Sequence, residues 1–187
     1  MNTHYKLLTA LALLLLAAPA AYPRTPTVCF EAESAQSLHA PFEVVTEPAG
    51  ATRRDPAQIP SGNAYLEIAE GKGSPPENDD GEAVFPFAVR EAGVYVLWCR
   101  VWWADECANS FTMHVDAAPP FTFGQDPTFR RWHWVKAPSG LEQLDLSPGE
   151  HTLTVRNRED GVRLDQILLV RNRRYVPVNI EDVTGAK

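Results

Sequence analysis

Short runs that alternate apolar and polar residues dominate this sequence from residue 28 onward, and turn-forming residues separate them. The clearest run covers residues 93–103, where Trp98 stands between Leu97 and Cys99 and therefore lies on the opposite face of the predicted strand. Runs of this kind, rich in Val, Trp and Tyr, are typical of half-buried β-strands. The other strand-like runs cover residues 28–32, 42–47, 64–69, 83–89, 110–116, 129–136, 141–146, 150–156 and 164–170.

Evidence for helices is weak, because beyond the N-terminal segment no long stretch repeats apolar residues at spacings of three and four. The 16 prolines are spread along the chain, and each would interrupt a helix interior. Two long segments, residues 48–63 and 71–81, predict loops, and long loops in a compact domain often bind ligands. The pattern therefore predicts one all-β domain, a sandwich or a barrel, followed by a polar and flexible tail over residues 178–187.

The first 21 residues have the pattern of a secretory signal peptide. Lys6 precedes an apolar run over residues 7–18, interrupted by Thr9, and small residues follow it. This run is about twelve residues long, whereas a membrane-spanning helix needs roughly 20. An N-terminal membrane anchor is the alternative interpretation of the segment. We expect the mature protein to be secreted or periplasmic, since no later segment is apolar enough to cross a membrane.

The chain is acidic, with a formal net charge of −7 at pH 7. It therefore lacks the basic surface expected of a nucleic-acid-binding protein. Arg171, Arg173 and Arg174 form a local basic cluster, but three charges near the end of a domain usually belong to a solvated surface. We expect a monomer that binds neither nucleic acid nor, once the signal peptide is removed, a membrane.

Three cysteines leave at least one thiol unpaired within a monomer. Export would permit a disulfide between Cys99 and Cys107 or between Cys29 and Cys99. Buried free thiols are the alternative. The spacing of the cysteines matches no zinc-binding pattern, because the chain has no Cys-x-x-Cys pair.

Several segments, taken in order along the chain, form a recognisable series. They are Glu31-Ala32-Glu33, the strand from Gly93 to Arg100, the strand end Val115-Asp116, Trp132-His133-Trp134, the turn and strand from Leu146 to Leu153, and the final run from Gly161 to Leu169. This series resembles carbohydrate-binding modules of families 6 and 35 over residues 28–177. The resemblance implies a galactose-binding-like jelly roll, which is a two-sheet antiparallel β-sandwich without catalytic residues.

The resemblance also implies a structural calcium ion held by Glu31, Glu33 and Asp165. The chemistry of these residues is consistent with that role, because calcium prefers six to eight oxygen ligands. Glu31 and Glu33 are two residues apart, so on a strand both carboxylates point to one face and repel unless a cation or water separates them. Asp165 stands in an apolar run, where a lone carboxylate would be costly. The alternative is that all three acids are solvated at strand ends.

A sugar offers apolar C–H faces, which suit aromatic rings, and hydroxyl groups, which suit polar side chains. Trp102 and Trp103 are adjacent, so a strand buries only one of them, and we expect the other near the loop that ends at Asn109. The resemblance implies a sugar-stacking aromatic ring at Trp132 and an Asn where this chain has Arg163, whose guanidinium group would suit hydroxyls or an acidic sugar. The expected ligand site comprises Trp103, Trp132, Asn109, Asn157, Asp160 and Arg163.

Catalytic motifs are absent from the sequence, which has neither a Gly-x-Ser-x-Gly nucleophile turn nor a His-Glu-x-x-His metal site. We therefore expect no enzyme and no catalytic residues, but a secreted module that binds a polysaccharide or glycan through loop aromatics. One alternative is a structural or adhesive jelly roll that binds a protein or a cell-wall component, which a broad apolar patch would favour. Another is a small hydrolase, which a deep pocket with paired acids would favour.

Overall fold

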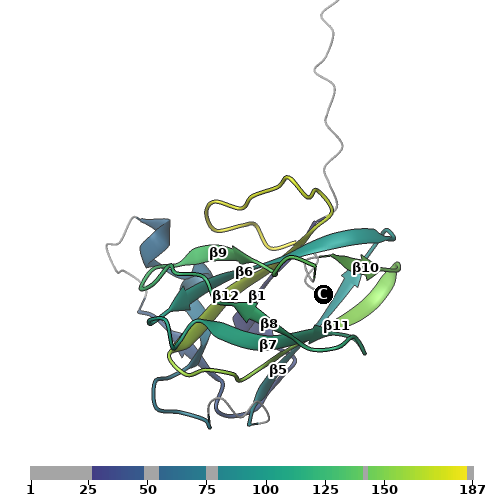
Figure 1. Cartoon of the computed structure of the whole chain (residues 1–187). Coiled ribbons are helices and arrows are strands. Elements are labelled where there is room, and N and C mark those ends of the chain that lie inside the picture. Colours follow the sequence, from purple (N-terminus) through teal and green to yellow (C-terminus); the bar gives the residue numbers. More distant parts are fainter. Residues whose placement is uncertain (1–26, 49–54, 75–79, 141–142, 185–187) are drawn as a thin grey trace, which may run out of the picture.

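The computed structural model describes residues 27–48, 55–74, 80–140 and 143–184, in which two antiparallel β-sheets pack face to face (Figure 1). Sheet 1 contains β1 (Thr27–Glu31), β3 (Glu43–Thr46), β4 (Ala64–Ile68), β6 (Gly93–Trp103), β9 (His133–Lys136), β10 (Leu144–Leu146) and β12 (Val162–Val170). Sheet 2 contains β2 (Ser37–Leu38), β5 (Glu82–Val89), β7 (Ser110–Val115), β8 (Phe121–Gly124) and β11 (Gly149–Arg156). Three single-turn 3-10 helices join them, η1 (Ala32–Ser34), η2 (Pro56–Gln58) and η3 (Ser61–Asn63).

The strand β12 is the centre of sheet 1. Along one edge it pairs with β6, and along the other its first half pairs with β4 and its second half with β1. Strand β6 continues the sheet to β9 and β10, while sheet 2 has the order β2-β5-β11-β7-β8. The predicted all-β fold, a two-sheet antiparallel jelly-roll sandwich, is confirmed.

Strict alternation along β6 places one set of side chains in the core and the other on the outer face of sheet 1. Leu97, Cys99 and Trp103 are buried between the sheets, as the alternation predicts. Trp98 belongs to a separate apolar cluster on the outer face. The outward-pointing residues of β6 therefore provide a row of large side chains that other segments of the chain cover.

The C-terminal strap, residues 171–184, crosses the outer face of sheet 1 after β12 (Figure 1). The indole Nε1 of Trp134 donates a hydrogen bond to the carbonyl oxygen of Asn179, with a donor–acceptor distance of 2.6 Å. Near the end of the strap, Thr184 and Cys29 exchange backbone hydrogen bonds of 2.9 and 3.2 Å. Under the strap lies an apolar cluster of Cys29, Val96, Leu168 and Val170, against which Trp98, Trp134 and Tyr175 pack.

Two sequence predictions about the chain ends have different outcomes. The predicted signal peptide, residues 1–21, lies outside the described residues. The predicted flexible tail, residues 178–187, is described as far as Thr184, and that part is bonded to β1 and to sheet 1 rather than loose. The side-chain composition of this segment does not indicate the attachment, because backbone groups make most of the hydrogen bonds.

Predicted and observed strands agree best where the alternation is long. The eleven-residue β6 covers the predicted range in full, whereas β8 has only four residues and was not predicted. The predicted run over residues 129–136 shortens to His133–Lys136. No helix among the described residues has the length and hydropathy to cross a membrane.

The three cysteines are free in this structure. Cys29 and Cys99 lie on opposite faces of sheet 1, so the pairing considered between them does not form. Burial raises the pKa of the Cys29 thiol to about 12 and raises that of Cys99 well above its ordinary value. Both thiols therefore behave as small apolar core groups, while Cys107 is exposed.

Candidate functional site

Trp103, predicted as a ligand-binding aromatic residue, is fully buried between the two sheets. Its ring packs against that of Phe111, with centroids 5.4 Å apart, and its Nε1 donates to the Asp126 carboxylate at 2.6 Å. The prediction that β6 buries one of the two adjacent tryptophans holds, but Trp102 is the half-buried one. Trp103 therefore serves the core and does not face a ligand.

Trp132 is also almost completely buried, with 4% of its surface exposed. Its ring meets the edge of Tyr65 with centroids 5.3 Å apart, and the Arg100 guanidinium lies 5.6 Å from its centre. Its backbone N–H donates to the carbonyl of Ala57 at 2.9 Å, which fixes the η2 segment against sheet 1. What remains of Trp132 at the surface lines a pocket on the outer face of sheet 1.

Arg163, expected to meet a sugar, is held by neighbouring side chains. Its guanidinium carbon lies 4.2 Å from the ring centre of Trp102 and 5.1 Å from that of Tyr65. Its Nε donates to Glu67 at 2.7 Å. A cation between two aromatic rings stabilises their arrangement, so Arg163 joins β12 to β6 and β4 across the outer face.

The remaining predicted ligand residues hold loops together. Asn157 is fully buried, and its Nδ2 donates to Asp80 at 2.6 Å. The carboxylate of Asp160 accepts the backbone N–H of Gly71 at 2.5 Å. Asn109 donates its backbone N–H to Glu159 at 2.9 Å. These contacts are local to the ends of the loops, and the structure does not bring them together with Trp103 or Trp132 into one cleft.

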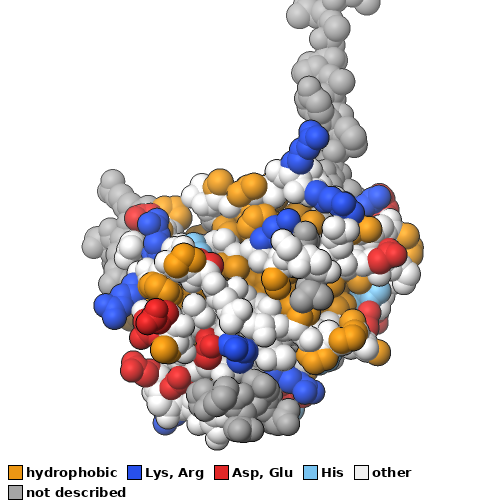
Figure 2. Space-filling model, in the orientation of Figure 1, with side chains coloured by type: hydrophobic (Ala, Val, Ile, Leu, Met, Phe, Trp, Pro, Cys, Tyr) orange, Lys and Arg blue, Asp and Glu red, His pale blue; other side chains and the backbone are white. Residues whose placement is uncertain are grey.

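A different cluster of aromatic residues forms a pocket that the sequence did not indicate. The tryptophan pocket has a volume of about 370 Å³ and lies on the outer face of sheet 1, between the η2 segment and the C-terminal strap. Its lining comprises Asp55, Pro56, Ala57, Trp98, Arg100, Arg131, Trp132, His133, Trp134, Val176, Pro177, Val178 and Asn179. Figure 1 shows the strap at the top of the molecule, and Figure 2, in the same orientation, shows orange apolar side chains along that edge.

Trp98 has a buried indole N–H that finds no hydrogen-bond acceptor among the described residues. Buried donors are nearly always paired, so this enclosed and unpaired N–H is a local cost to the fold. Trp134, by contrast, uses its indole N–H to hold Asn179 of the strap. Trp98 and Trp134 therefore contribute indole ring surface to the pocket, since the N–H of Trp98 is enclosed and that of Trp134 is bonded.

His133, which also lines this pocket, has both ring nitrogens engaged. Its Nδ1 lies 3.0 Å from the carbonyl of Arg131, and its Nε2 lies 3.1 Å from both carboxylate oxygens of Asp126. Burial alone would raise the pKa of Asp126, but hydrogen bonds from His133, Trp103 and Thr128 lower it. A histidine with both nitrogens engaged positions the loop and has no free nitrogen to act as a general base.

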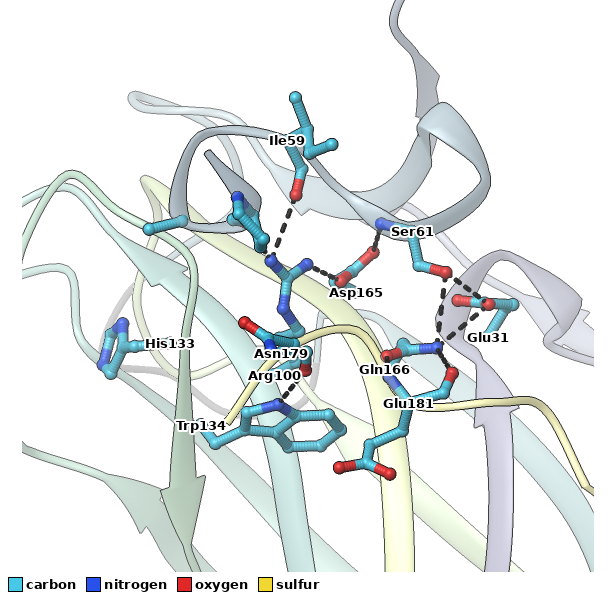
Figure 3. Close-up of polar contacts among 12 residues, drawn as sticks. Glu31, Ile59, Ser61, Arg100, His133, Trp134, Asp165, Gln166, Asn179 and Glu181 are labelled. Carbon is cyan, nitrogen blue, oxygen red and sulfur yellow. Dashed lines mark hydrogen bonds and ion pairs between the residues drawn. The ribbon is translucent and has the colours of Figure 1, made fainter. Parts of the chain in front are cut away.

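Asp165 lies at a bulge in β12 and forms a buried ion pair with Arg100 (Figure 3). Its Oδ2 accepts from Arg100, and its Oδ1 accepts the backbone N–H of Ser61 at 2.8 Å. Arg100 also donates to the carbonyls of Pro56 and Ile59, the latter at 3.1 Å. Burial raises the pKa of Asp165 to about 7, against the opposing effect of the guanidinium. Arg100 thus already supplies a counter-charge to Asp165, and the predicted role of Asp165 as a calcium ligand stays a prediction.

Glu31 and Glu33, in contrast, retain unused oxygens. Oε1 of Glu31 accepts from Ser61 Oγ at 2.6 Å and from Gln166 at 3.1 Å, but Oε2 of each glutamate is buried without a partner among the described residues. Burial and the nearby Glu31 charge raise the pKa of Glu33. No set of three or more His, Cys, Asp or Glu in the described ranges is grouped to hold a metal. The role of Glu31 and Glu33 as calcium ligands therefore stays a prediction at this point.

Comparison with known proteins gives a result at the level of structure only. No protein-family model matches the chain, and no curated protein matches it. Among solved structures, a family 35 carbohydrate-binding module from Clostridium thermocellum has a TM-score of 0.53 at 15% identity, over 77% of this chain and 97% of that one. The C-terminal family 6 module of the laminarinase LamC from Zobellia galactanivorans has a TM-score of 0.51 at 16% identity, over 78% and 99% of the two chains.

This chain has the fold of family 6 and family 35 carbohydrate-binding modules. The same fold links it to an enzyme, the GH26-CBM35 β-(1,4)-mannanase of Podospora anserina, with a TM-score of 0.56 at 20% identity. That match covers 82% of this chain but only 29% of the mannanase. This chain therefore matches nearly the full length of the two modules but only a minor part of the enzyme.

Proposed function

We propose that this chain is a non-catalytic module that binds a polysaccharide or glycan in the tryptophan pocket. One observation supports the proposal most directly: three indoles line a single pocket of about 370 Å³. A module with this fold that acts outside the cell would also agree with the predicted signal peptide.

The chemistry of the pocket suits a sugar ring. Indole faces bury the apolar C–H face of a pyranose, while the edge of the ring needs donors and acceptors for its hydroxyls. Arg131 supplies a guanidinium group and Asp55 a carboxylate at the pocket wall. Oδ1 of Asp55 already accepts the backbone N–H of Ala57 at 2.9 Å, and the carboxylate keeps further acceptor positions for a hydroxyl.

Replacement of Trp134 with Ala should weaken glycan binding by about tenfold or more, because it removes one indole face from the pocket and releases Asn179 of the strap. Calorimetric titration with mannan, xylan, laminarin and galactan oligosaccharides measures this loss. Trp102→Ala is the matched control, because Trp102 stacks on Arg163 and does not line the pocket. Equal weakening by both variants would contradict this placement of the site, and the absence of binding to any glycan would favour a protein or cell-wall partner.

We further propose that Glu31 and Glu33 hold a structural calcium ion through their unpaired oxygens. An ideal Cβ on Gly62 would lie 3.4 Å from Oε1 of Glu33, so backbone of the η3 turn lies beside this carboxylate and offers carbonyl oxygens. The ion would offset the repulsion between two half-buried acids and fix η1 and η3 against β12. Asp165 is left out of this proposal, because the buried Arg100 guanidinium already supplies its counter-charge.

Removal of calcium with EDTA should lower the melting temperature by about 5–10 °C, the shift expected for an ion present at roughly 100 times its dissociation constant. Added calcium should restore it. Glu33→Gln should abolish the response, whereas Glu67→Gln, which removes an acid bonded to Arg163, should retain it. A melting temperature that does not change on EDTA treatment would rule out the ion.

A further inference from the structure

One row of side chains crosses the outer face of sheet 1 on four neighbouring strands. Glu31 of β1 is the cross-strand partner of Gln166 of β12, and Gln166 is the partner of Arg100 of β6. Arg100 is in turn the partner of Trp134 of β9. Residues opposite one another on neighbouring strands share a face of the sheet. The four side chains therefore all point toward the segments that cover this face, where Arg100 holds the η2 segment and Trp134 holds the strap.

Gln166 bonds to both of these covering segments (Figure 3). Its side-chain amide exchanges two hydrogen bonds with the backbone of Glu181 in the strap: Nε2 donates to the carbonyl oxygen at 2.9 Å, and Oε1 accepts the N–H at 3.0 Å. A neighbouring strand would exchange the same pair of bonds, so the amide attaches a segment that lies outside the sheet. Nε2 also lies 3.3 Å from Oγ of Ser61 in η3 and 3.1 Å from Oε1 of Glu31.

These bonds lie close to the pocket walls, but Gln166 itself is fully buried and does not line the pocket. Glu181 follows the pocket-lining Asn179 by two residues, and Ser61 follows the pocket-lining residues 55–57 by four. Water does not reach the buried amide to replace a lost bond, so its partners would stay unpaired without it. A side chain that bonds to both segments at these points restricts how far the two walls can separate.

We infer that Gln166 is a positioning residue that holds the two walls of the tryptophan pocket in place and so sets its affinity for a glycan. The effect on affinity rests on the proposed glycan-binding function, whereas the effect on the walls needs no ligand. A strap that is attached in only a fraction of the molecules lowers the apparent affinity by that fraction. The contacts between the pocket and its ligand are the same in the molecules that bind.

Gln166→Met keeps a long side chain but removes both bonds to Glu181. In the ligand-free protein, the indole N–H of Trp134 should exchange with solvent about tenfold faster, because its acceptor Asn179 lies on the loosened strap. The affinity for whichever oligosaccharide of mannan, xylan, laminarin or galactan the wild-type protein binds best should fall by about tenfold. Hydrogen exchange followed by NMR and calorimetric titration measure the two effects.

Tyr175→Phe is the matched control. The hydroxyl of Tyr175 donates to the side chain of Glu181 at 2.7 Å, so this variant removes a bond to the same strap residue and leaves the two backbone bonds to Gln166. Tyr175 does not line the pocket. The exchange of the Trp134 N–H and the glycan affinity should therefore both stay close to those of the wild-type protein.

Gln166→Glu tests whether the amide donor is responsible. A carboxylate at this position still accepts the N–H of Glu181 but has no hydrogen for its carbonyl oxygen. Burial and the adjacent carboxylate of Glu31 raise the pKa of such a group, while Arg100, whose charge is paired with Asp165, opposes them. Relative to the wild-type protein at the same pH and calcium concentration, the variant should bind about tenfold more weakly at about pH 8 and recover at about pH 5. Gln166→Met should bind weakly at both.

The possible results separate this inference from the proposed function. Wild-type exchange or wild-type affinity in Gln166→Met would overturn the inference, as would equal losses in Tyr175→Phe. A Gln166→Glu variant that stays weak at acid pH would also overturn it, because the donor would then not hold the strap. Faster exchange at Trp134 in a protein that binds none of the oligosaccharides would support the role of Gln166 at the walls and overturn the glycan-binding function. If Gln166→Met fails to fold, Gln166→Glu decides, since it keeps the size of the side chain and one bond to Glu181.

Discussion

Replacement of Arg100 with Met should lower the free energy of unfolding by about 3–5 kcal/mol, the usual cost of leaving one partner of a buried ion pair alone. The side chains of Arg100 and Asp165 are 2% and 0% exposed, so solvent does not compensate for the loss. The same guanidinium also satisfies the carbonyls of Pro56 and Ile59, which would lose their donor (Figure 3). Urea unfolding followed by tryptophan fluorescence measures the change.

A double variant shows whether the unpaired charge causes the loss. Arg100→Met with Asp165→Asn should be more stable than Arg100→Met alone, because the remaining side chain is neutral and its oxygen still accepts from Ser61. Arg171→Met is the surface control, since Arg171 and Glu91 are 34% and 58% exposed, and such pairs contribute at most about 1 kcal/mol. If Arg100→Met costs no more than Arg171→Met, the pair does not anchor the η2 segment.

Trp103→Ala should likewise cost about 3–5 kcal/mol, because it empties the largest fully buried side-chain volume in the described core and leaves Asp126 without its indole donor. Trp102→Ala, one residue away on the same strand, should cost about 1 kcal/mol, because Trp102 is half-buried and mainly stacks on Arg163. Thermal and urea unfolding of both variants measure the difference. Similar losses for the two would contradict the placement of these side chains on opposite faces of β6.

This pair of tryptophans illustrates how far sequence reasoning reaches. Period-two alternation requires that the two rings point to opposite faces, and the burial of Leu97 and Cys99 shows that the alternation along β6 was interpreted correctly. The choice of Trp103 as the exposed ring was wrong, because the end of a long strand can still lie under a loop. Trp103 lies beneath the segment that carries Asp126, and no local pattern shows that covering.

Asp165 gives a second example. The sequence correctly marks it as a carboxylate in an apolar setting that needs a counter-charge, but Arg100 supplies that charge from 65 residues away. Local spacing cannot identify a partner at that distance, because the pairing depends on β6 and β12 being neighbours in sheet 1. The predicted role of Glu31 and Glu33 as calcium ligands stays a prediction, and their unpaired oxygens are its structural support.

The tryptophan pocket was missed for a topological reason. Its floor comes from β6 and β9, whose strands the sequence predicts, but its walls come from residues 55–57 and 176–179. Neither segment has a periodic pattern. The predicted boundary between the domain and its tail, after residue 177, also falls within the segment 176–179. Hydrogen bonds to backbone carbonyls from the side chains of Trp134 and Arg100 and from the backbone N–H of Trp132 hold the walls on the sheet.

Because each wall is attached by a few bonds and neither belongs to a strand, ligand preference and fold stability rest on largely separate parts of the chain. Exchanges within these two short segments would reshape the recognition surface while the sandwich interior stayed the same. Such a scaffold lends itself to directed evolution: under the glycan-binding function that we propose, libraries confined to a handful of wall positions would sample new saccharide specificities at little risk of misfolding.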